Sequence, residues 1–201
     1  MKQIIILIMI ISSYTCYADK FYLRSGIVNS SVDDTEIIFS TGNTVLFSDT
    51  IDYDFSISPE VALGYYFDEN CSIELVANRC KADGESDVID DIEVRNLNIG
   101  LEAKLEFPIN QNIKPYISIG VGNQIFEAKI DNDKIKKDTF MGTYALGVIF
   151  KIDTLVSIYT QYKCVTTEPI SSQIDVVGSL VDIEHNNEDI TQFQLGWILH
   201  F

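Results

Sequence analysis

Charged side chains recur at alternate positions within stretches that are otherwise apolar or small. In the segment LEAKL, residues 101–105, a glutamate and a lysine alternate with leucine and alanine. Charges that share one face of a strand and become buried require partners of opposite charge. We therefore predict a structural salt-bridge network on the inner face of the fold, formed by Arg24, Glu60, Glu74, Glu102, Lys104 and Lys163.

Candidates for catalysis and metal binding are few. The only histidines are His185 and His200, and hydrolysis by a serine, a histidine and a carboxylate needs all three groups together. His185 lies near Glu184 and Glu188, but one loop histidine is weak evidence, so we expect no enzymatic activity. The segment DGESDVIDD, residues 83–91, suggests a divalent cation but lacks EF-hand spacing. We expect no bound metal and no cofactor.

The residues that position these charges alternate with period two, which is typical of β-strands. Between Phe55 and Phe67 the odd positions are apolar or aromatic, apart from Pro59, and the even positions are mostly small or polar. The pattern predicts eight strands at 20–29, 54–67, 71–80, 93–107, 114–126, 139–151, 155–165 and 190–201. Asn123 interrupts the apolar face of the fifth strand and suggests a bulge near Gly122.

Short and long connections alternate between the predicted strands, with both termini on the short-turn side. The short turns are 68–70, 108–113 and 152–154; the long loops are 30–53, 81–92, 127–138 and 166–189. This order predicts an all-β, eight-stranded antiparallel up-and-down barrel, with strands long enough to cross a bilayer. An apolar inner face would instead give a soluble, exported, lipocalin-like barrel that binds a small apolar ligand.

Glycine and aromatic residues favour an outward apolar face and a transmembrane barrel. Seven of the eleven glycines then face inward, where a narrow, side-chain-filled barrel needs small residues: Gly26, Gly64, Gly100, Gly120, Gly122, Gly147 and Gly196. The outward aromatic residues form two girdles, as at the two interfaces of a bilayer. They are Phe21, Tyr65, Phe67, Phe107, Phe150 and Phe201 on the short-turn side, and Phe55, Phe140, Tyr162 and Phe193 on the long-loop side. Because such a barrel is narrow, a channel is the weaker alternative.

The first eighteen residues predict export. A basic start, an apolar run over 4–11 and small residues up to Ala18 are typical of a cleaved signal peptide, residues 1–18, followed by a barrel domain at 19–201. The mature chain then keeps an odd number of cysteines, Cys71, Cys80 and Cys164.

Acidic residues concentrate in the long loops. The chain has 14 basic and 30 acidic residues, a net charge of −16 that argues against nucleic acid as a partner. The four loops hold 20 of the acids and 5 of the bases. Such loops keep the rim solvated, or they bind a partner such as a host-cell receptor, since binding often resides in loops held by a rigid scaffold.

Two segments resemble the small outer-membrane β-barrels of the OmpA, OmpX and opacity-protein type. SISPEVALGYYFDENCSIELVAN, residues 56–78, resembles their second and third strands, and the final FQLGWILHF resembles their assembly signal. The resemblance implies a surface protein of the bacterial outer membrane with extracellular loops and periplasmic termini, in contact with lipid or lipopolysaccharide. It implies an envelope or adhesion role, and recognition of Trp197, Leu199 and Phe201 by the barrel-assembly machinery.

Overall fold

The computed structural model describes residues 20–32, 35–41, 44–53, 56–85, 92–130, 133–168, 170–176, 179–185 and 189–201. The predicted signal peptide lies outside these residues. The described chain forms twelve strands: β1 (Phe21–Val32), β2 (Thr35–Thr41), β3 (Thr44–Tyr53), β4 (Ser56–Tyr66), β5 (Cys71–Glu85), β6 (Ile92–Glu106), β7 (Ile113–Ile130), β8 (Asp133–Lys151), β9 (Val156–Thr167), β10 (Ile170–Val176), β11 (Ser179–His185) and β12 (Asp189–His200). Within the described residues, no helix has the length and apolar character needed to cross a membrane.

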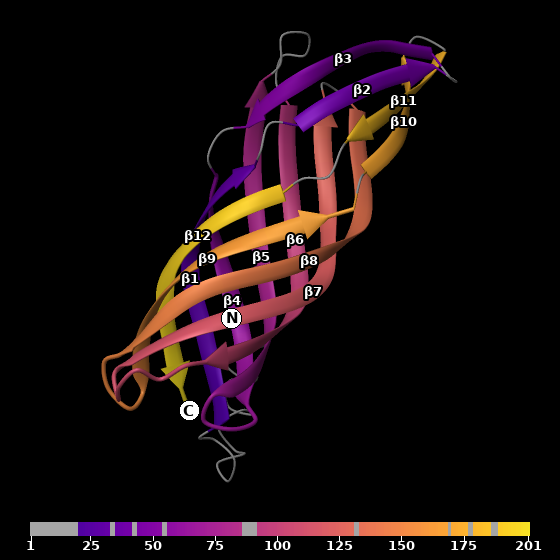
Figure 1. Cartoon of the computed structure of the whole chain (residues 1–201). Helices are drawn as coiled ribbons and strands as arrows, with labels where there is room; N and C mark the ends of the chain where they lie inside the picture. Colours follow the sequence, from indigo (N-terminus) through magenta and orange to yellow (C-terminus); the bar gives the residue numbers. More distant parts are fainter. Residues whose placement is uncertain are drawn as a thin grey trace, which may run out of the picture.

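Eight of the strands close into an antiparallel barrel (Figure 1). Its order is β1, β4, β5, β6, β7, β8, β9 and β12, with β12 returning to pair with β1. The closing pair runs from Tyr22 opposite His200 to Val32 opposite Ile190. Closure leaves the wall without an edge strand. The predicted eight-stranded up-and-down barrel is confirmed.

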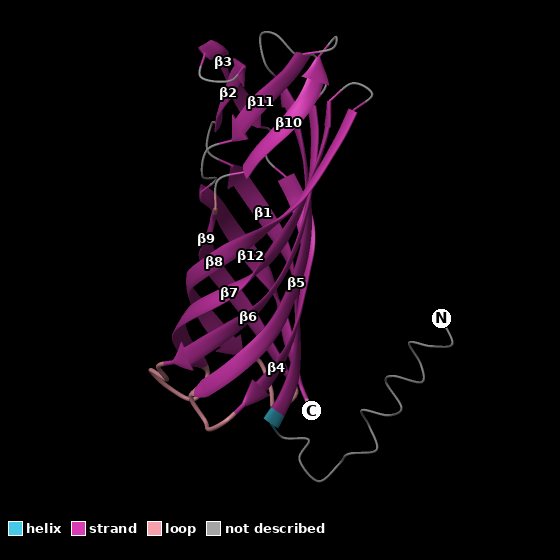
Figure 2. Cartoon of the chain, turned by 90° about the vertical axis from the view of Figure 1, so that its right-hand side faces the viewer, coloured by secondary structure: helices cyan, strands magenta, loops and turns pink. Residues whose placement is uncertain are grey.

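Each short turn is held by one side chain that accepts two backbone hydrogen bonds. The carboxylate Oδ1 of Asp68 accepts from the N–H groups of Asn70 and Cys71, both at 2.8 Å. These hydrogen bonds favour the ionised carboxylate and so lower the pKa of Asp68 below its ordinary value. Asn110 and Asp153 play the same part in the other two turns. This is the Asx-turn geometry, and the turns gather at the end of the barrel where the C-terminus lies (Figure 2).

The opposite end differs from the prediction, because the segments expected as long loops contain strands. β2 and β3 form a hairpin within 30–53, β10 and β11 form another within 166–189, and β11 pairs with β2. Their order, β10-β11-β2-β3-β5, extends the sheet beyond the barrel, at the top of Figure 1. Runs rich in β-branched residues, such as TEIIFST in β2, favour strands once another segment satisfies their backbone groups.

The two faces of the wall are of opposite character. Outward positions carry aliphatic and aromatic side chains such as Ile119, which is 69% exposed, whereas inward positions carry polar side chains such as Gln194, which is 0% exposed. This arrangement inverts that of a soluble barrel and excludes an apolar ligand cup. The described aromatics of the two predicted girdles all point outward, with Phe140, Tyr162 and Phe193 exposed on the loop side. The side chain of Phe55 lies outside the described part.

Strand β7 is regular, so the predicted bulge near Gly122 is wrong. Its register with β6 and β8 runs without a shift. Asn123 faces outward, opposite Ile99 and the girdle residue Phe140, so it lies where the apolar face ends.

Glycines on the inner face make room for tyrosine rings. A Cβ at Gly64 would overlap the ring of Tyr22, its partner on β1, and one at Gly147 would overlap the ring of Tyr116 on β7. Each ring therefore lies flat across the backbone of the next strand. This packing fills the turn-side half of the barrel without widening it.

Candidate functional site

The interior of the barrel holds a chain of eight buried or half-buried charges that alternate in sign. The structure brings all six residues of the predicted network into it and adds Glu106 and Lys114. From the turn-side end inward, this ion-pair chain runs Lys114, Glu106, Lys104, Glu74, Arg24, Glu60, Lys163 and Glu102. Its successive N–O distances are 3.0, 3.7, 2.8, 2.7, 2.7, 3.2 and 2.6 Å.

Arg24 is the central link of the chain and is 2% exposed. Its Nη1 donates to Glu60 at 2.7 Å, while its Nε lies 3.0 Å from Glu74 and its Nη2 2.7 Å from the same carboxylate oxygen. The guanidinium also lies 5.0 Å from the ring of Tyr159. A planar guanidinium can serve two carboxylates at once, which an ammonium cannot do with the same fixed geometry.

Lys104 occupies a cage of aromatic rings and carboxylates. Its Nζ lies 4.6 Å from the ring centre of Tyr22, 5.4 Å from Tyr116 and 5.9 Å from Tyr66. The hydroxyl of Tyr22 donates to Glu74 at 2.6 Å, and that of Tyr66 donates to Glu106 at 2.7 Å. The ring faces thus stabilise the cation while the hydroxyls stabilise the carboxylates beside it.

The ion-pair chain has no net charge, because it contains four acidic and four basic groups. Burial of a charge is costly unless it is paired and hydrogen-bonded, and every member of this ion-pair chain has an oppositely charged partner within 3.7 Å. Parity alone places Glu106 on the inner face, two residues after Lys104. The sequence does not show that the side chain of Lys114 reaches into the barrel from the turn-side end. This side chain is 27% exposed.

The loop-side half of the interior is lined differently. Asn78, Asn98 and Gln124 are cross-strand neighbours on β5, β6 and β7, and together we call them the amide row. They are buried, yet the Oδ1 atoms of both asparagines and both amide atoms of Gln124 have no hydrogen-bond partner among the described residues. Beside the row lies a cavity of about 20 Å³, also lined by Glu60, Glu102 and Lys163. That is space for about one water molecule.

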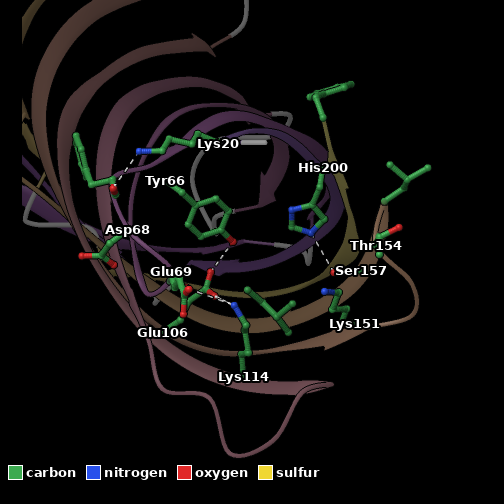
Figure 3. Close-up of a pocket in the computed structure, with 14 residues that line it drawn as sticks. Lys20, Tyr66, Asp68, Glu69, Glu106, Lys114, Lys151, Thr154, Ser157 and His200 are labelled. Carbon is green, nitrogen blue, oxygen red and sulfur yellow. Dashed lines mark hydrogen bonds and ion pairs between the residues drawn. The ribbon is translucent and has the colours of Figure 1, made fainter. Parts of the chain in front are cut away.

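A wider hollow of about 730 Å³ opens at the turn-side end (Figure 3). Glu106 and Lys114 line it together with Lys20, Lys151 and His200.

His200, by contrast, does not complete a catalytic triad. Its Nε2 lies 3.1 Å from the hydroxyl of Ser157, and its ring stacks on Tyr66. Within the described chain, no hydrogen bond joins a carboxylate to His200, so the orienting group of a triad is missing from the geometry. The side chain of His185, the one candidate that the sequence offered, lies outside the described part.

The remaining predicted site residues lie on the outer wall. Trp197 and Phe201 are exposed and Leu199 is half-buried, all on the outward side of the closing strand. Side chains of most predicted loop acids, including all of those in the segment 83–91, fall outside the described part. Among the described residues, no three His, Cys, Asp or Glu side chains are grouped to hold a metal, and no disulfide links Cys71, Cys80 and Cys164.

The barrel wall alternates apolar outward and polar inward side chains and has no edge strand, and the sequence matches a family with this architecture. Residues 5–201 match the sequence profile described as "Outer membrane protein beta-barrel domain". The chain belongs to this family. It is therefore a small β-barrel of the bacterial outer membrane, as the resemblance of its strands implied.

Solved structures agree on the fold. OprG from Pseudomonas aeruginosa is similar with a TM-score of 0.69 at 16% identity, over 92% of this chain and 97% of that one. Neisserial surface protein A matches with a TM-score of 0.60 at 15% identity, over 90% and 97%. Ail, the attachment invasion locus protein of Yersinia pestis, matches with a TM-score of 0.52 at 14% identity, over 91% and 99%. A search of the curated proteins finds no match.

The same fold also carries a protease. OmpT from Escherichia coli matches with a TM-score of 0.53 at 8% identity. At these identities the likeness concerns the fold alone.

Proposed function

We propose that this protein is a closed, non-enzymatic surface barrel that holds its acidic loop-side segments outside the cell. In this role it supports the envelope and presents a contact surface to a host cell or another partner, with its termini in the periplasm. The observation that supports this role most directly is the ion-pair chain. A lumen filled by eight mutually paired charges and four packed tyrosines suits a rigid scaffold better than a wide pore.

Two further observations support display. The segments beyond the barrel pair into a sheet, β10-β11-β2-β3, that continues β5, so the wall extends past the outer girdle rather than ending in unpaired loops. The names of two structural neighbours refer to a surface protein and to attachment and invasion. A scaffold of this kind positions binding segments precisely while it tolerates sequence change in them.

Hairpin replacement tests the display role. We would replace β2–β3 (35–53) and, separately, β10–β11 (170–185) by short Gly-Asn turns and measure adhesion of expressing cells to cultured host cells. The proposal predicts loss of adhesion for at least one replacement. A matched control carries Asp87→Asn, Asp90→Asn and Asp91→Asn in the β5–β6 connection. It removes acidic charge without removing a hairpin, so it shows whether adhesion depends on charge or on the hairpins. Heat-modifiable gel migration checks folding, and unchanged adhesion in every folded variant would leave only the envelope role.

The closing strand also carries the proposed assembly signal. Trp197, Leu199 and Phe201 face outward, where the assembly machinery can contact them before lipid does. Deletion of Phe201 should lower the amount of protein in the outer membrane severalfold without preventing refolding in detergent. Equal loss in cells and in detergent would instead point to a purely structural role of the last residue.

A further inference from the structure

The hollow at the turn-side end of the barrel has room for a small ligand. Its volume of about 730 Å³ lies within the range of small-molecule sites, roughly 300–1,000 Å³. Three acids and three lysines line it, so neither sign is in excess: Asp68, Glu69, Glu106, Lys20, Lys114 and Lys151. A balanced lining is complementary to a ligand that carries both charges, rather than to a polyanion or a polycation.

Two of these charged groups are available to a ligand. Lys114 donates to Glu106 at 3.0 Å, and Asp68 accepts the two backbone hydrogen bonds of its turn, so these three groups already have partners in the fold. Among the described residues, neither the carboxylate of Glu69 nor the ammonium of Lys151 has a hydrogen bond or an ion pair, and both side chains are exposed. One free acid and one free base therefore face the hollow.

The two free charges lie on opposite sides of the barrel mouth. Glu69 is in the turn between β4 and β5, and Lys151 is the last residue of β8, before the turn to β9. Around the ring of eight strands these two turns are four strands apart, which is half of the circumference. Figure 3 shows Glu69 beside Glu106 on one side of the hollow, and Lys151 beside Ser157 on the other.

The lining between the two charges is suited to a peptide. The ring of Tyr66 stacks on that of His200, with ring centres 6.3 Å apart, and Ile149 adds an aliphatic surface. The Nε2 of His200 lies 3.1 Å from the hydroxyl of Ser157, so this pair offers a polar contact beside Lys151. Flat rings and an aliphatic side chain can pack against a peptide main chain, while the polar groups at each side fix its ends.

From this placement we propose that the turn-side hollow binds a short zwitterionic peptide across the mouth of the barrel, with its ammonium at Glu69 and its carboxylate at Lys151. Charge-assisted hydrogen bonds at the two ends give the bound peptide one direction. The termini face the periplasm in the proposed function, so the peptide is either a soluble periplasmic peptide or a stem peptide of the cell wall. Both sources carry the same two charged groups.

Calorimetric titration of the refolded full chain with trialanine tests the site. Glu69→Gln and Lys151→Met should each weaken binding roughly tenfold, because each removes one charge-assisted contact. N-acetylated trialanine should bind equally to the wild type and to Glu69→Gln, and C-amidated trialanine should bind equally to the wild type and to Lys151→Met. The matched control Glu168→Gln, Lys136→Met removes one exposed charge of each sign at the loop-side end and should change binding less than about twofold.

Three results would overturn the proposal: no saturable binding of trialanine by the wild type, equal weakening by the control variant, or capped peptides that leave the effects of Glu69→Gln and Lys151→Met unchanged. Heat-modifiable gel migration verifies that each variant is folded. The hairpin replacements lie at the other end of the barrel and should still bind trialanine. Loss of adhesion and loss of peptide binding are therefore distinguishable.

Cosedimentation with isolated cell walls separates the two sources of the peptide. Retention of the protein by the walls, with release by excess trialanine, identifies the stem peptide as the ligand. Binding of trialanine without retention by the walls identifies a soluble peptide.

Discussion

The two halves of the barrel interior solve the same packing problem with different chemistry. The turn-side half is filled by the ion-pair chain and by tyrosine rings that lie over glycines, and its polar atoms are almost all paired. The loop-side half is lined by the amide row, whose buried amide atoms lack partners among the described residues and lie beside a cavity of about 20 Å³. Buried polar groups stabilise a fold only when they are satisfied. The contrast therefore locates the stability of the barrel in its turn-side half.

Removal of Arg24 should have the largest effect. Arg24→Ala leaves Glu60 and Glu74 without their shared partner, and breaking a buried pair from one side costs about 3–5 kcal/mol. The free energy of unfolding, from urea titration in lipid vesicles, should fall by this amount. Arg79→Ala, an exposed arginine on the outer wall, serves as the control and should change it by less than about 0.5 kcal/mol. A small effect of Arg24→Ala on the free energy of unfolding would show that the ion-pair chain does not stabilise the barrel.

A methyl group added in each half sharpens the comparison. Gly64→Ala places its Cβ against the rigid ring of Tyr22, and overpacking of this kind costs about 1–3 kcal/mol. Gly100→Ala, in the loop-side half, meets the flexible end of Met141 at 3.1 Å and the carbonyl oxygen of Val121 at 3.0 Å. It should cost less, because the methionine end can move. Equal losses in unfolding free energy would show that the halves are equally tight.

The same replacement of glutamine by methionine should have opposite signs in the two halves. Gln194 accepts from Arg24 and Gln161 and donates to Glu60 and Gln192, so Gln194→Met should destabilise by about 1–3 kcal/mol. Gln124 is equally buried but its amide is unpaired among the described residues, so Gln124→Met should be neutral or stabilising by up to about 1 kcal/mol. Urea titration measures both. Destabilisation by Gln124→Met would mean that water satisfies the amide row.

The smallest effect is expected at the turns. The depressed pKa of Asp68 means that its contribution is present above the ordinary aspartate pKa and is lost as pH falls through the lower, folded value. Asp68→Ala should therefore lower the urea midpoint slightly at neutral pH and not at strongly acidic pH. Asp68→Asn, which keeps the accepting oxygen, should retain most of the turn and lose the pH dependence. A pH-independent loss in Asp68→Ala would contradict the hydrogen-bonded carboxylate.

Period-two alternation made the barrel and its two faces predictable, because parity decides which side chains share a side. It also placed Arg24 and its five predicted partners on one face. Parity does not give height along the barrel, which depends on the stagger between strands. The entry of Lys114 into the ion-pair chain, and the lack of hydrogen-bond partners for the amide row among the described residues, therefore required the structure. The hairpins β2–β3 and β10–β11 were missed for a related reason, since β11 pairs with a segment some 140 residues earlier.

The central claim is that the paired charges close the lumen, and planar-bilayer recording of the refolded wild-type protein tests it most directly. We expect no steady single-channel current from the wild type, and a less stable Arg24→Ala barrel that still opens no conductance. Large, steady currents from the wild type would contradict it.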